Sequence, residues 1–320
     1  MIYYTWAYRR LLLDLLGCQA KYLVAVDARG NFCAVMPLMA MSGPLGLVYN
    51  SLPFFGSYGG VLARDAKAES IIWANYSHIV EASGVAAATV VMNPLQNGDP
   101  PISHQFMDQR IGQFTTLSCS GDVEAALLAT IDSTARRNIK AALKAGIKVQ
   151  IENDALPDLE AIHRENIQAI GGRVKPSAFF TLLNKHFTPD RDYRLYVARL
   201  GQEIVGTLLL FYAGQVVDYF IPGTRLEYRQ RQPSALLLFR AMTDAARAGF
   251  PVWNWGGTWL TQENILRFKR KWGAQDRIYR YFTNANNHLI YKTLPKDMLR
   301  DYGYFFLLPF NQLDTIKEKT

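Results

Sequence analysis

Hydrophobic and polar positions alternate with two different periods along the chain, and this pattern predicts a mixed α/β protein. In the first third, apolar runs at residues 21–27 and 32–39 flank a polar turn at 28–31, which is typical of a hairpin. Residues 66–83 carry apolar side chains at helical spacing, which predicts an amphipathic helix. The β-branched run at 86–92 predicts a buried strand.

The rest of the chain repeats this order of elements at greater length. Helices are predicted at 122–131, 135–145, 156–170, 177–187, 233–248 and 262–272. Strands are predicted at 113–117, 147–151, 193–200, 203–211, 215–221 and 251–255, and a final hairpin at 277–283 and 288–292. Because a hairpin, a helix and a strand occur in both halves, the pattern predicts two related α/β domains, at residues 1–120 and 121–320.

Composition and charge narrow the class of protein only a little. The 320 residues are enough for two domains that each bury a core. A net charge of +8 suits an anionic partner such as RNA, nucleotide phosphates or a membrane surface, without choosing among them. No apolar stretch approaches the roughly 20 residues of a membrane span.

The cysteines and the first residues of the chain indicate the cellular compartment in which the protein is expected. Cys18, Cys33 and Cys119 are odd in number and lack metal-ligand spacing, so reduced thiols are the simplest interpretation. In residues 9–18, Asp14 interrupts an apolar run shorter than the ~7–15 residues of a signal-peptide core, which favours an amphipathic helix. We therefore expect a cytoplasmic protein without metal or permanently bound cofactor, and leave peripheral contact with the inner face of the membrane open.

Three segments of the second half resemble a known family. They are the strand pair 203–211 and 215–220 with the loop 228–234, the motif Trp253-Asn254-Trp255-Gly256-Gly257-Thr258, and the motif Phe268-Lys269-Arg270-Lys271-Trp272-Gly273. Together they are similar to the Fem-type branch of the GNAT N-acyltransferase superfamily. That branch includes peptidoglycan-bridge aminoacyltransferases and acyltransferases of surface-polysaccharide pathways. The likeness covers residues 130–285, and the first domain resembles the family only by layout.

The resemblance implies tandem GNAT-like domains around mixed sheets, with the acceptor side in residues 1–120 and the donor and catalytic side in 121–320. It also implies transfer of an aminoacyl or acyl group onto an amine of a cell-wall or surface-glycan precursor. Aminoacyltransferase members of the branch take the amino acid from aminoacyl-tRNA. Other GNAT proteins use acyl-CoA and hold its pyrophosphate on backbone N–H groups at a helix N-terminus.

The loop before Pro233 departs from the usual GNAT pattern, Gln/Arg-x-x-Gly-x-Gly/Ala. Residues 229–235 have the expected position and basic character but contain no glycine. Without glycine, the backbone cannot approach a pyrophosphate as closely, so the departure favours aminoacyl-tRNA over acyl-CoA as donor. The candidate donor-binding residues of this loop are Arg229, Gln230, Arg231 and Ser234.

Lys269 is the sharpest candidate for chemistry. At about 100° per residue it falls inside an apolar arc formed by Ile265, Phe268 and Trp272, away from the basic face of its helix. An unpaired buried ammonium is costly, so Lys269 must snorkel to water, pair structurally or meet an anion. The resembled aminoacyltransferases have a Phe-Lys pair at the active site, which implies that Phe268 and Lys269 hold the donor or stabilise charge on its carbonyl oxygen.

A second group of candidates is basic. Arg136, Arg137, Lys140 and Lys144 fall within one roughly 100° face of a predicted helix, where like charges at i,i+4 repel by about 0.2–0.5 kcal/mol per pair. Phosphates of a tRNA would relieve this repulsion, which makes Arg136, Arg137 and Lys140 candidate donor contacts. A solvated basic face is the alternative.

The candidate general base is Asp218, because desolvation in an apolar strand would raise its pKa; a structural hydrogen bond is equally consistent with its position. Candidate acceptor contacts lie in loops and among the aromatic residues: Tyr58, Tyr228, Asn254 and Trp255. Tyr58 belongs to the glycine-rich turn 56–60, in a region that contributes to the acceptor pocket in the family.

Two other functions stay open at this point. One is a CoA-dependent N-acyltransferase in exopolysaccharide or amino-sugar metabolism, which would bind acyl-CoA. The other is a non-catalytic module that binds RNA or a membrane through its basic face, for which substitution of Lys269 would leave function intact.

Overall fold

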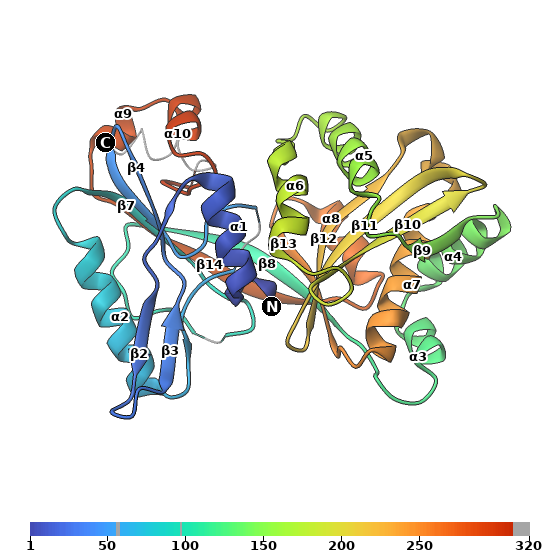
Figure 1. Cartoon of the computed structure of the whole chain (residues 1–320), viewed down its shortest axis with the longest axis horizontal. Coiled ribbons are helices and arrows are strands. Elements are labelled where there is room, and N and C mark those ends of the chain that lie inside the picture. Colours follow the sequence, from blue (N-terminus) through green and yellow to red (C-terminus); the bar gives the residue numbers. More distant parts are fainter. Residues whose placement is uncertain (56–57, 97, 310–320) are drawn as a thin grey trace. The chain divides into compact units, whose positions relative to one another are not determined.

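The computed structural model describes residues 1–55, 58–96 and 98–309 (Figure 1). The chain forms two compact units. Unit 1 comprises Met1–Ala7 and Ile111–Arg277, and unit 2 comprises Tyr8–Arg110 and Ile278–Thr320. The division therefore differs from a single cut near residue 120, because the chain after Arg277 joins the unit formed by the first part of the chain.

The physical reason is a strand pairing that sequence order does not reveal. Tyr281–Ala285 of β14 (Gln275–Ala285) pair antiparallel with Ala87–Val91 of β7 (Val85–Val91). All seven residues of β7 are buried, and β14 extends the unit 2 sheet beyond β7 with a segment from the other end of the chain.

Unit 2 has neighbouring strands in the order β1-β4-β5-β7-β14 and a separate sheet in the order β2-β3-β6. The remaining strands are β1 (Gln19–Ala20), β2 (Leu23–Val26), β3 (Phe32–Met36), β4 (Met39–Gly43), β5 (Gly46–Asn50) and β6 (Leu62–Ala63). The helices are α1 (Trp6–Leu16), which begins in unit 1, α2 (Ala66–Val80), α9 (Leu289–Lys292) and α10 (Pro295–Asp301). Ile72, Trp73 and Tyr76 of α2 are buried in the core of this unit.

Unit 1 contains the strand order β13-β12-β11-β10-β9, extended on one side by β8. The strands are β8 (Phe106–Thr116), β9 (Lys148–Ile151), β10 (Tyr193–Leu200), β11 (Glu203–Ala213), β12 (Val216–Thr224) and β13 (Val252–Trp259). The helical segments are η1 (Ile2–Tyr4), α3 (Val123–Thr130), α4 (Ser133–Lys144), α5 (Leu156–Gln168), α6 (Ser177–His186), η2 (Leu226–Arg231), α7 (Pro233–Arg247) and α8 (Glu263–Arg270).

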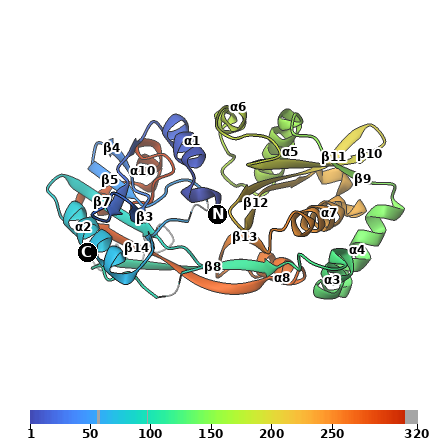
Figure 2. The ribbon, with the colours of Figure 1, turned by 60° about the horizontal axis from the view of Figure 1, so that its bottom comes forward.

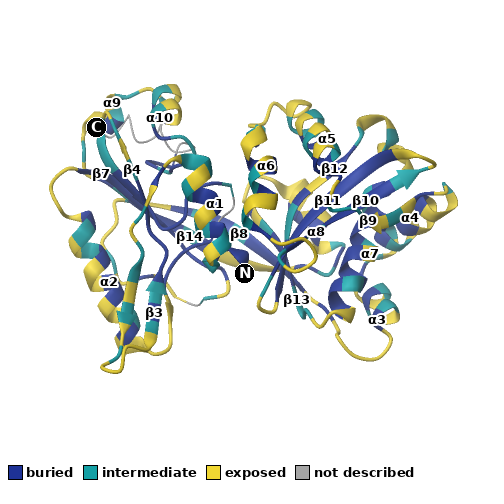
Figure 3. Cartoon of the chain, in the orientation of Figure 1, coloured by how far each residue is buried: buried dark blue, intermediate teal, exposed yellow. Residues whose placement is uncertain are grey.

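Helices cover both faces of the unit 1 strands. Figure 2 shows α5 and α6 on one face and α7 on the other, and α3 and α4 pack against α7. Strands β12 and β13 are parallel, so a crossover connection must join the end of β12 to the start of β13. Helix α7 forms part of this connection. Figure 3 shows that the strands are mostly buried, whereas the helices keep exposed outer faces.

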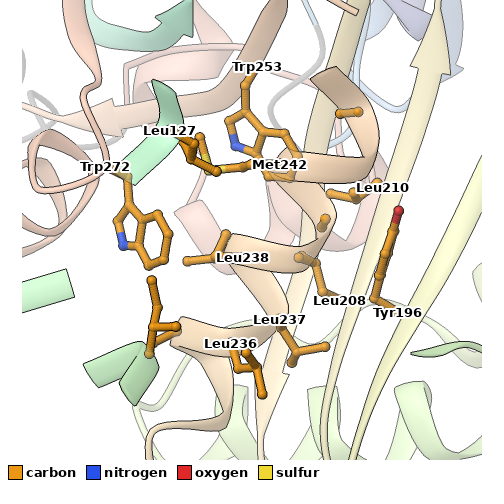
Figure 4. Close-up of a cluster of buried hydrophobic side chains, with 14 of the residues drawn as sticks. Leu127, Tyr196, Leu208, Leu210, Leu236, Leu237, Leu238, Met242, Trp253 and Trp272 are labelled. Atoms are coloured by element: carbon orange, nitrogen blue, oxygen red, sulfur yellow. The ribbon is translucent and has the colours of Figure 1, made fainter. Parts of the chain in front are cut away.

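The α7 face of unit 1 holds its main apolar core. Figure 4 shows Leu236, Leu238 and Met242 of α7 among side chains from the strands and from α3. Trp253 is completely buried in this cluster. Each such large side chain contributes about 1.5–3 kcal/mol through removal from water, so the core fixes α7 firmly against β10–β13.

Local interactions set the ends of several elements. The Asp122 carboxylate accepts from the backbone N–H groups of Glu124 and Ala125, and the Asp132 carboxylate accepts from Ala135. Gly146 ends α4 with φ of 81°, a conformation that favours glycine.

The predicted C-terminal hairpin is wrong. Residues 277–283 lie within β14, but Leu289–Lys292 form the helical turn α9. Strand β14 already pairs with β7, so it does not need residues 288–292 as a partner. No helix in the described part of the chain is both long and apolar enough to cross a membrane.

Candidate active site

Strands β12 and β13 run side by side only briefly. Their pairing joins Val216–Asp218 to Val252–Asn254, with Asp218 opposite Asn254. Each strand then continues, β12 to Thr224 and β13 to Trp259, with no further pairing between these described segments. A bulge at Phe220 interrupts the register of β12 with β11 at this point. Beyond Asp218 and Asn254, the backbone groups of these two described strands are therefore not paired with each other as they would be in a regular sheet.

Lys269 of α8 lies beside the diverging end of β13. Its side chain is only 5% exposed, and its Nζ donates to Thr258 Oγ1 at 2.7 Å and to the Gly256 carbonyl at 3.5 Å. Burial lowers the pKa of this amine to about 8, and the negative charge of Asp276 acts in the opposite direction. Near neutral pH the amine is therefore mostly protonated and held in a fixed position. It releases its proton more readily than an ordinary lysine does.

The sequence correctly predicts a buried Lys269, but it places the buried face of α8 incorrectly. The helix buries Leu266 with Lys269, whereas Ile265 is 42% exposed and Phe268 is 38% exposed. The reason is that α8 packs against β13, so the buried face is rotated away from the arc of largest apolar side chains. The Phe268 ring stays near the site, with its centroid 6.2 Å from that of Trp255.

Asp218 and Asn254 form a buried polar link at the point where the strands separate. Asn254 Nδ2 donates to Asp218 Oδ1 at 2.6 Å, and the Ile2 N–H donates to Asp218 Oδ2 at 3.1 Å. Asn254 Oδ1 in turn accepts from the Gly256 N–H at 2.9 Å. Burial raises the pKa of Asp218, while the nearby N-terminal charge and these hydrogen bonds lower it. Both carboxylate oxygens therefore accept hydrogen bonds, and Asn254 connects Asp218 to the residue that contacts Lys269.

Trp255 lies on the other face of β13. It is 2% exposed and belongs to the core that includes α7. Its Nε1 donates to Thr115 Oγ1 at 2.9 Å, and Thr115 Oγ1 donates to the Trp272 carbonyl at 3.0 Å. The structure therefore places Trp255 as a buried support for β13 and α8.

A small polar pocket lies at the N-terminus of α7. It has a volume of about 290 Å³ and is lined by Asn166, Pro222, Gly223, Thr224, Arg229, Gln232 and Ser234. The Asn166 amide donates to the Thr224 carbonyl at 2.7 Å and accepts from its N–H at 3.1 Å. The hydroxyls of Thr224 and Ser234 are 2.6 Å apart and hydrogen-bonded. Gln232 has φ of 59°, so it adopts the left-handed conformation that glycine takes more easily.

The remaining loop residues are more exposed. Gln230 and Arg231 lie on the surface of η2, and the Arg231 guanidinium is 6.0 Å from the centre of the Tyr228 ring. The Tyr228 hydroxyl donates to Glu203 Oε2 at 2.6 Å. These described contacts hold Tyr228 against β11, and none of them reaches Lys269 or its partners.

The basic residues of α4 differ in whether their side chains bind another part of the protein or extend into solvent. Arg136 Nη1 donates to the carbonyls of Leu128 and Ile131, each at 2.8 Å. It therefore provides a hydrogen-bond donor to carbonyl groups at the C-terminal end of α3. Arg137 and Lys140 are exposed. Arg137 and Lys140, together with the exposed Lys144 on the same face, therefore present their charge to solvent.

Tyr58 lies in unit 2, whereas Lys269 and its partners lie in unit 1. Its side chain is fully buried, and its ring packs edge-on against Tyr279 with centroids 5.1 Å apart. Gly56 and Ser57, which complete the predicted glycine-rich turn, lie outside the described residues.

Sequence reasoning misses one side chain at this site and one buried cation elsewhere in unit 1. Thr258 holds Lys269, and no pattern in the sequence distinguishes it as the partner of that lysine. Lys175, in the connection between α5 and α6, is 8% exposed, and no pattern in the sequence distinguishes it. Among the described residues, no group of three or more His, Cys, Asp or Glu side chains is arranged to hold a metal ion.

Comparison with known families gives a match for part of the chain. Residues 129–270 match the family model described as an acetyltransferase (GNAT) domain, a range that includes Asp218, Asn254, Thr258 and Lys269. No curated protein matches the chain in sequence. Residues 129–270 are therefore similar to a GNAT acetyltransferase domain, and the chain has the fold of tandem GNAT proteins.

Solved structures show which proteins share this fold. FemX is similar to the chain with a TM-score of 0.66 and 14% identity, over 88% of this chain and 91% of FemX. The C-terminal domain (DUF2156) of a putative lysylphosphatidylglycerol synthetase from Agrobacterium fabrum gives 0.58 and 12%, over 93% of each chain. A tandem GNAT protein from the clavulanic acid biosynthesis pathway gives 0.50 and 11%, over 83% of each chain. The fold is therefore that of tandem, Fem-type GNAT proteins, which confirms the similarity predicted from the sequence.

Proposed function

We propose that this acyltransferase moves an aminoacyl group from aminoacyl-tRNA onto an amine of a cell-wall or surface-glycan precursor. The observation that carries the proposal is Lys269, a buried amine held by Thr258 where β12 and β13 diverge. Attack of an amine on an ester produces a tetrahedral intermediate with negative charge on the former carbonyl oxygen. A fixed cation in a site that excludes water stabilises that charge strongly.

The role of each residue follows from its contacts. Lys269 stabilises the oxyanion, and Thr258 orients the Lys269 Nζ. Phe268, with its ring exposed beside Trp255, offers an apolar surface to the donor. Asp218 and Asn254 set the position of Gly256, and Asn254 also lies on the face of β13 from which an acceptor would approach.

The choice of aminoacyl-tRNA rests on the loop before α7. Pro233 has no N–H group, and Ala235 N already donates to the Gln232 carbonyl at 3.1 Å, so the helix end offers few backbone donors to a pyrophosphate. Arg229 and Arg231 are exposed, as are Arg137 and Lys140 of α4. Exposed cations suit the repeated phosphates of a nucleic acid, whose affinity comes mainly from such contacts.

One observation favours a second candidate, transfer from acyl-CoA. The pocket at the N-terminus of α7 combines Arg229 with the amide of Asn166 and the hydroxyl of Ser234, which are suitable donors for a phosphate group. Titration calorimetry with acetyl-CoA and gel shift with aminoacyl-tRNA separate the two donors. The proposal predicts a shift with tRNA and no heat of acetyl-CoA binding.

The deciding experiment is a transfer assay. Purified protein is incubated with tRNA charged with a radiolabelled amino acid and with a lysine-containing UDP-linked muramyl pentapeptide, and the labelled product is resolved by chromatography. Lys269→Met is expected to lower kcat about 10²–10³-fold, the usual cost of removing one oxyanion donor. Lys271→Met, at the residue that follows α8, serves as the matched control and keeps the wild-type rate.

Two outcomes would contradict the proposal. Transfer from acetyl-CoA but from no charged tRNA would establish the second candidate instead. Wild-type activity in a folded Lys269→Met variant would remove the residue on which the mechanism depends. The proposed substrates place the reaction inside the cell, and a lipid-linked acceptor would bring the protein to the inner face of the membrane.

A further inference from the structure

Two buried side chains of β8 hold the backbone of α8 and of the residues after it, one on each side of Lys269. Gln113 Nε2 donates to the Leu266 carbonyl at 3.2 Å. Thr115 Oγ1 donates to the Trp272 carbonyl at 3.0 Å. Leu266 comes three residues before Lys269, and Trp272 comes three residues after it. Both β8 side chains are completely buried, so the segment that carries Lys269 is attached to a neighbouring strand at both ends.

Gln113 makes a second hydrogen bond, to an acidic side chain. Its Nε2 also donates to Asp276 Oδ1 at 2.9 Å, near the start of β14. Asp276 in turn forms an ion pair with Arg270, the last residue of α8. The two N–H hydrogens of one amide thus serve two acceptors, the α8 backbone and the Asp276 carboxylate. Gln113 therefore joins β8 to both α8 and β14.

The amide oxygen of Gln113 indicates that the amide nitrogen is what this position requires. Among the described contacts, Gln113 Oε1 is buried and accepts no hydrogen bond. The amide cannot turn over to relieve this, because Oε1 would then face a carbonyl and a carboxylate, and neither of these donates. A buried acceptor without a partner is costly, whereas methionine or leucine would fill similar space without that cost. Packing alone therefore does not explain a glutamine at this position.

The groups around Lys269 include one acidic side chain whose charge acts on its amine. Strand β13 presents neutral partners, Thr258 Oγ1 and the Gly256 carbonyl, and β8 presents the neutral Gln113. The other charged side chains of α8 and of the residue after it are Glu263, Arg267, Arg270 and Lys271. The charge of Asp276, on β14, raises the pKa of Lys269 against the larger effect of burial. The position of Asp276 therefore affects how strongly the ammonium form of Lys269 is favoured.

We propose that Gln113 is a positioning residue of the transfer reaction, which holds Asp276 and the α8 backbone so that the Lys269 ammonium stays fixed against Thr258. This inference rests on the proposed function, in which Lys269 stabilises the oxyanion. Gln113 is completely buried, so it acts through these groups and touches neither substrate. Without its amide, the Asp276 carboxylate keeps only its ion pair with the half-exposed Arg270 and turns with it toward solvent. Lys269 then loses the fixed position of its helix together with its counter-charge.

The first test follows the protonation of Lys269 without substrate. Trace labelling with acetic anhydride at a series of pH values, read by mass spectrometry, reports the pH at which an amine reaches half-maximal reactivity. For Lys269 in the wild type, this pH is expected near 8. Gln113→Met fills the space without a donor, and it should lower this pH by about 1 unit, because the Asp276 carboxylate is no longer held near the amine. Asp276→Asn removes the charge itself and should lower it as well.

The double variant decides whether Gln113 acts on Lys269 through Asp276. With residue 276 neutral, no charge is left for Gln113 to place, so Gln113→Met combined with Asp276→Asn should show the shift of Asp276→Asn alone. The control is Gln275→Met, which changes the exposed neighbour of Asp276 and should leave the half-reactivity of Lys269 near pH 8. Circular dichroism checks the folding of each variant. Additive shifts, or an unchanged half-reactivity in folded Gln113→Met, would overturn the proposal.

The transfer assay gives a second readout that loss of packing alone would not change. Because Lys269 acts as a cation, kcat of the wild type should fall as the pH rises through about 8, which gives the profile a descending limb. In Gln113→Met this limb should move to lower pH, and kcat at neutral pH should fall by up to about 10²-fold as Lys269 is misplaced. KM should change little, because the buried Gln113 touches no substrate. Gln113→Leu, a second variant without a donor, should behave in the same way.

The two measurements separate this inference from the proposed function. Absence of transfer by the wild type would overturn the proposed function, and the labelling shifts would still report whether Gln113 places Asp276 beside Lys269. A raised KM with an unchanged kcat and an unchanged descending limb in Gln113→Met would overturn the inference alone.

Discussion

At the scale of single residues, the site depends on how one buried amine is held. Thr258 is 2% exposed, and its Oγ1 is the shortest described contact of Lys269 Nζ, at 2.7 Å. A hydroxyl oxygen that accepts from an ammonium favours its charged form, so Thr258 opposes the effect of burial. The buried position of Lys269 follows from the sequence, but Thr258 does not, because strand alternation gives its face and not its partner.

Replacement of Thr258 by valine tests this arrangement. Thr258→Val keeps the shape of the side chain but removes the acceptor, so the pKa of Lys269 should fall further below about 8. The descending limb of the pH–activity profile then moves to lower pH, and kcat at pH 8 falls. The free energy of unfolding should drop by about 1–3 kcal/mol, the cost of an unsatisfied buried donor.

Urea denaturation and the pH profile of the transfer assay measure the two effects. Thr258→Ser retains the hydroxyl and should restore most of the profile. An unchanged descending limb in folded Thr258→Val would show that Thr258 does not set the protonation of Lys269.

At the scale of elements, helix periodicity locates most helices, but for α8 and α4 it does not predict which side chains contact the rest of the protein. In α8 the largest apolar residues, Ile265 and Phe268, stay exposed because the packed face is chosen by β13. In α4 the basic stripe looks uniform in sequence, yet Arg136 turns to cap α3, and this depends on where the neighbouring helix ends. Amphipathic patterns therefore predict that a helix forms, whereas the neighbouring elements determine which of its faces is buried and which residues form contacts.

The difference between Arg136 and Arg137 gives a paired prediction. Arg136→Ala leaves the Leu128 and Ile131 carbonyls without their donor, and we expect it to destabilise the protein by about 1–3 kcal/mol in urea denaturation. Arg137→Ala removes an exposed charge and should change stability by less than about 0.5 kcal/mol. Equal stability of the two variants would exclude the capping role of Arg136.

At the scale of the whole molecule, strand pairing between distant segments is the property that the sequence does not reveal. The repeated order of elements predicts two GNAT-like domains, and the fold confirms this. The pairing of β14 with β7 assigns the C-terminal segment to unit 2, and local patterns carry no information about a partner almost 200 residues away.

The net charge of +8 is also a property of the whole chain, and its consequence depends on where the exposed cations lie. If Arg229 and Arg137 each neutralise one tRNA phosphate, affinity should fall linearly with the logarithm of the salt concentration. Each single substitution to glutamine should then reduce the steepness of that line by about 1. Gel shifts with one charged tRNA from 50 to 300 mM KCl measure the slope. Arg29→Gln, which removes an exposed charge from the turn between β2 and β3, should leave it unchanged. A slope equally steep in Arg229→Gln and the wild type would mean that the loop before α7 does not touch the nucleic acid, and would favour acyl-CoA as the donor.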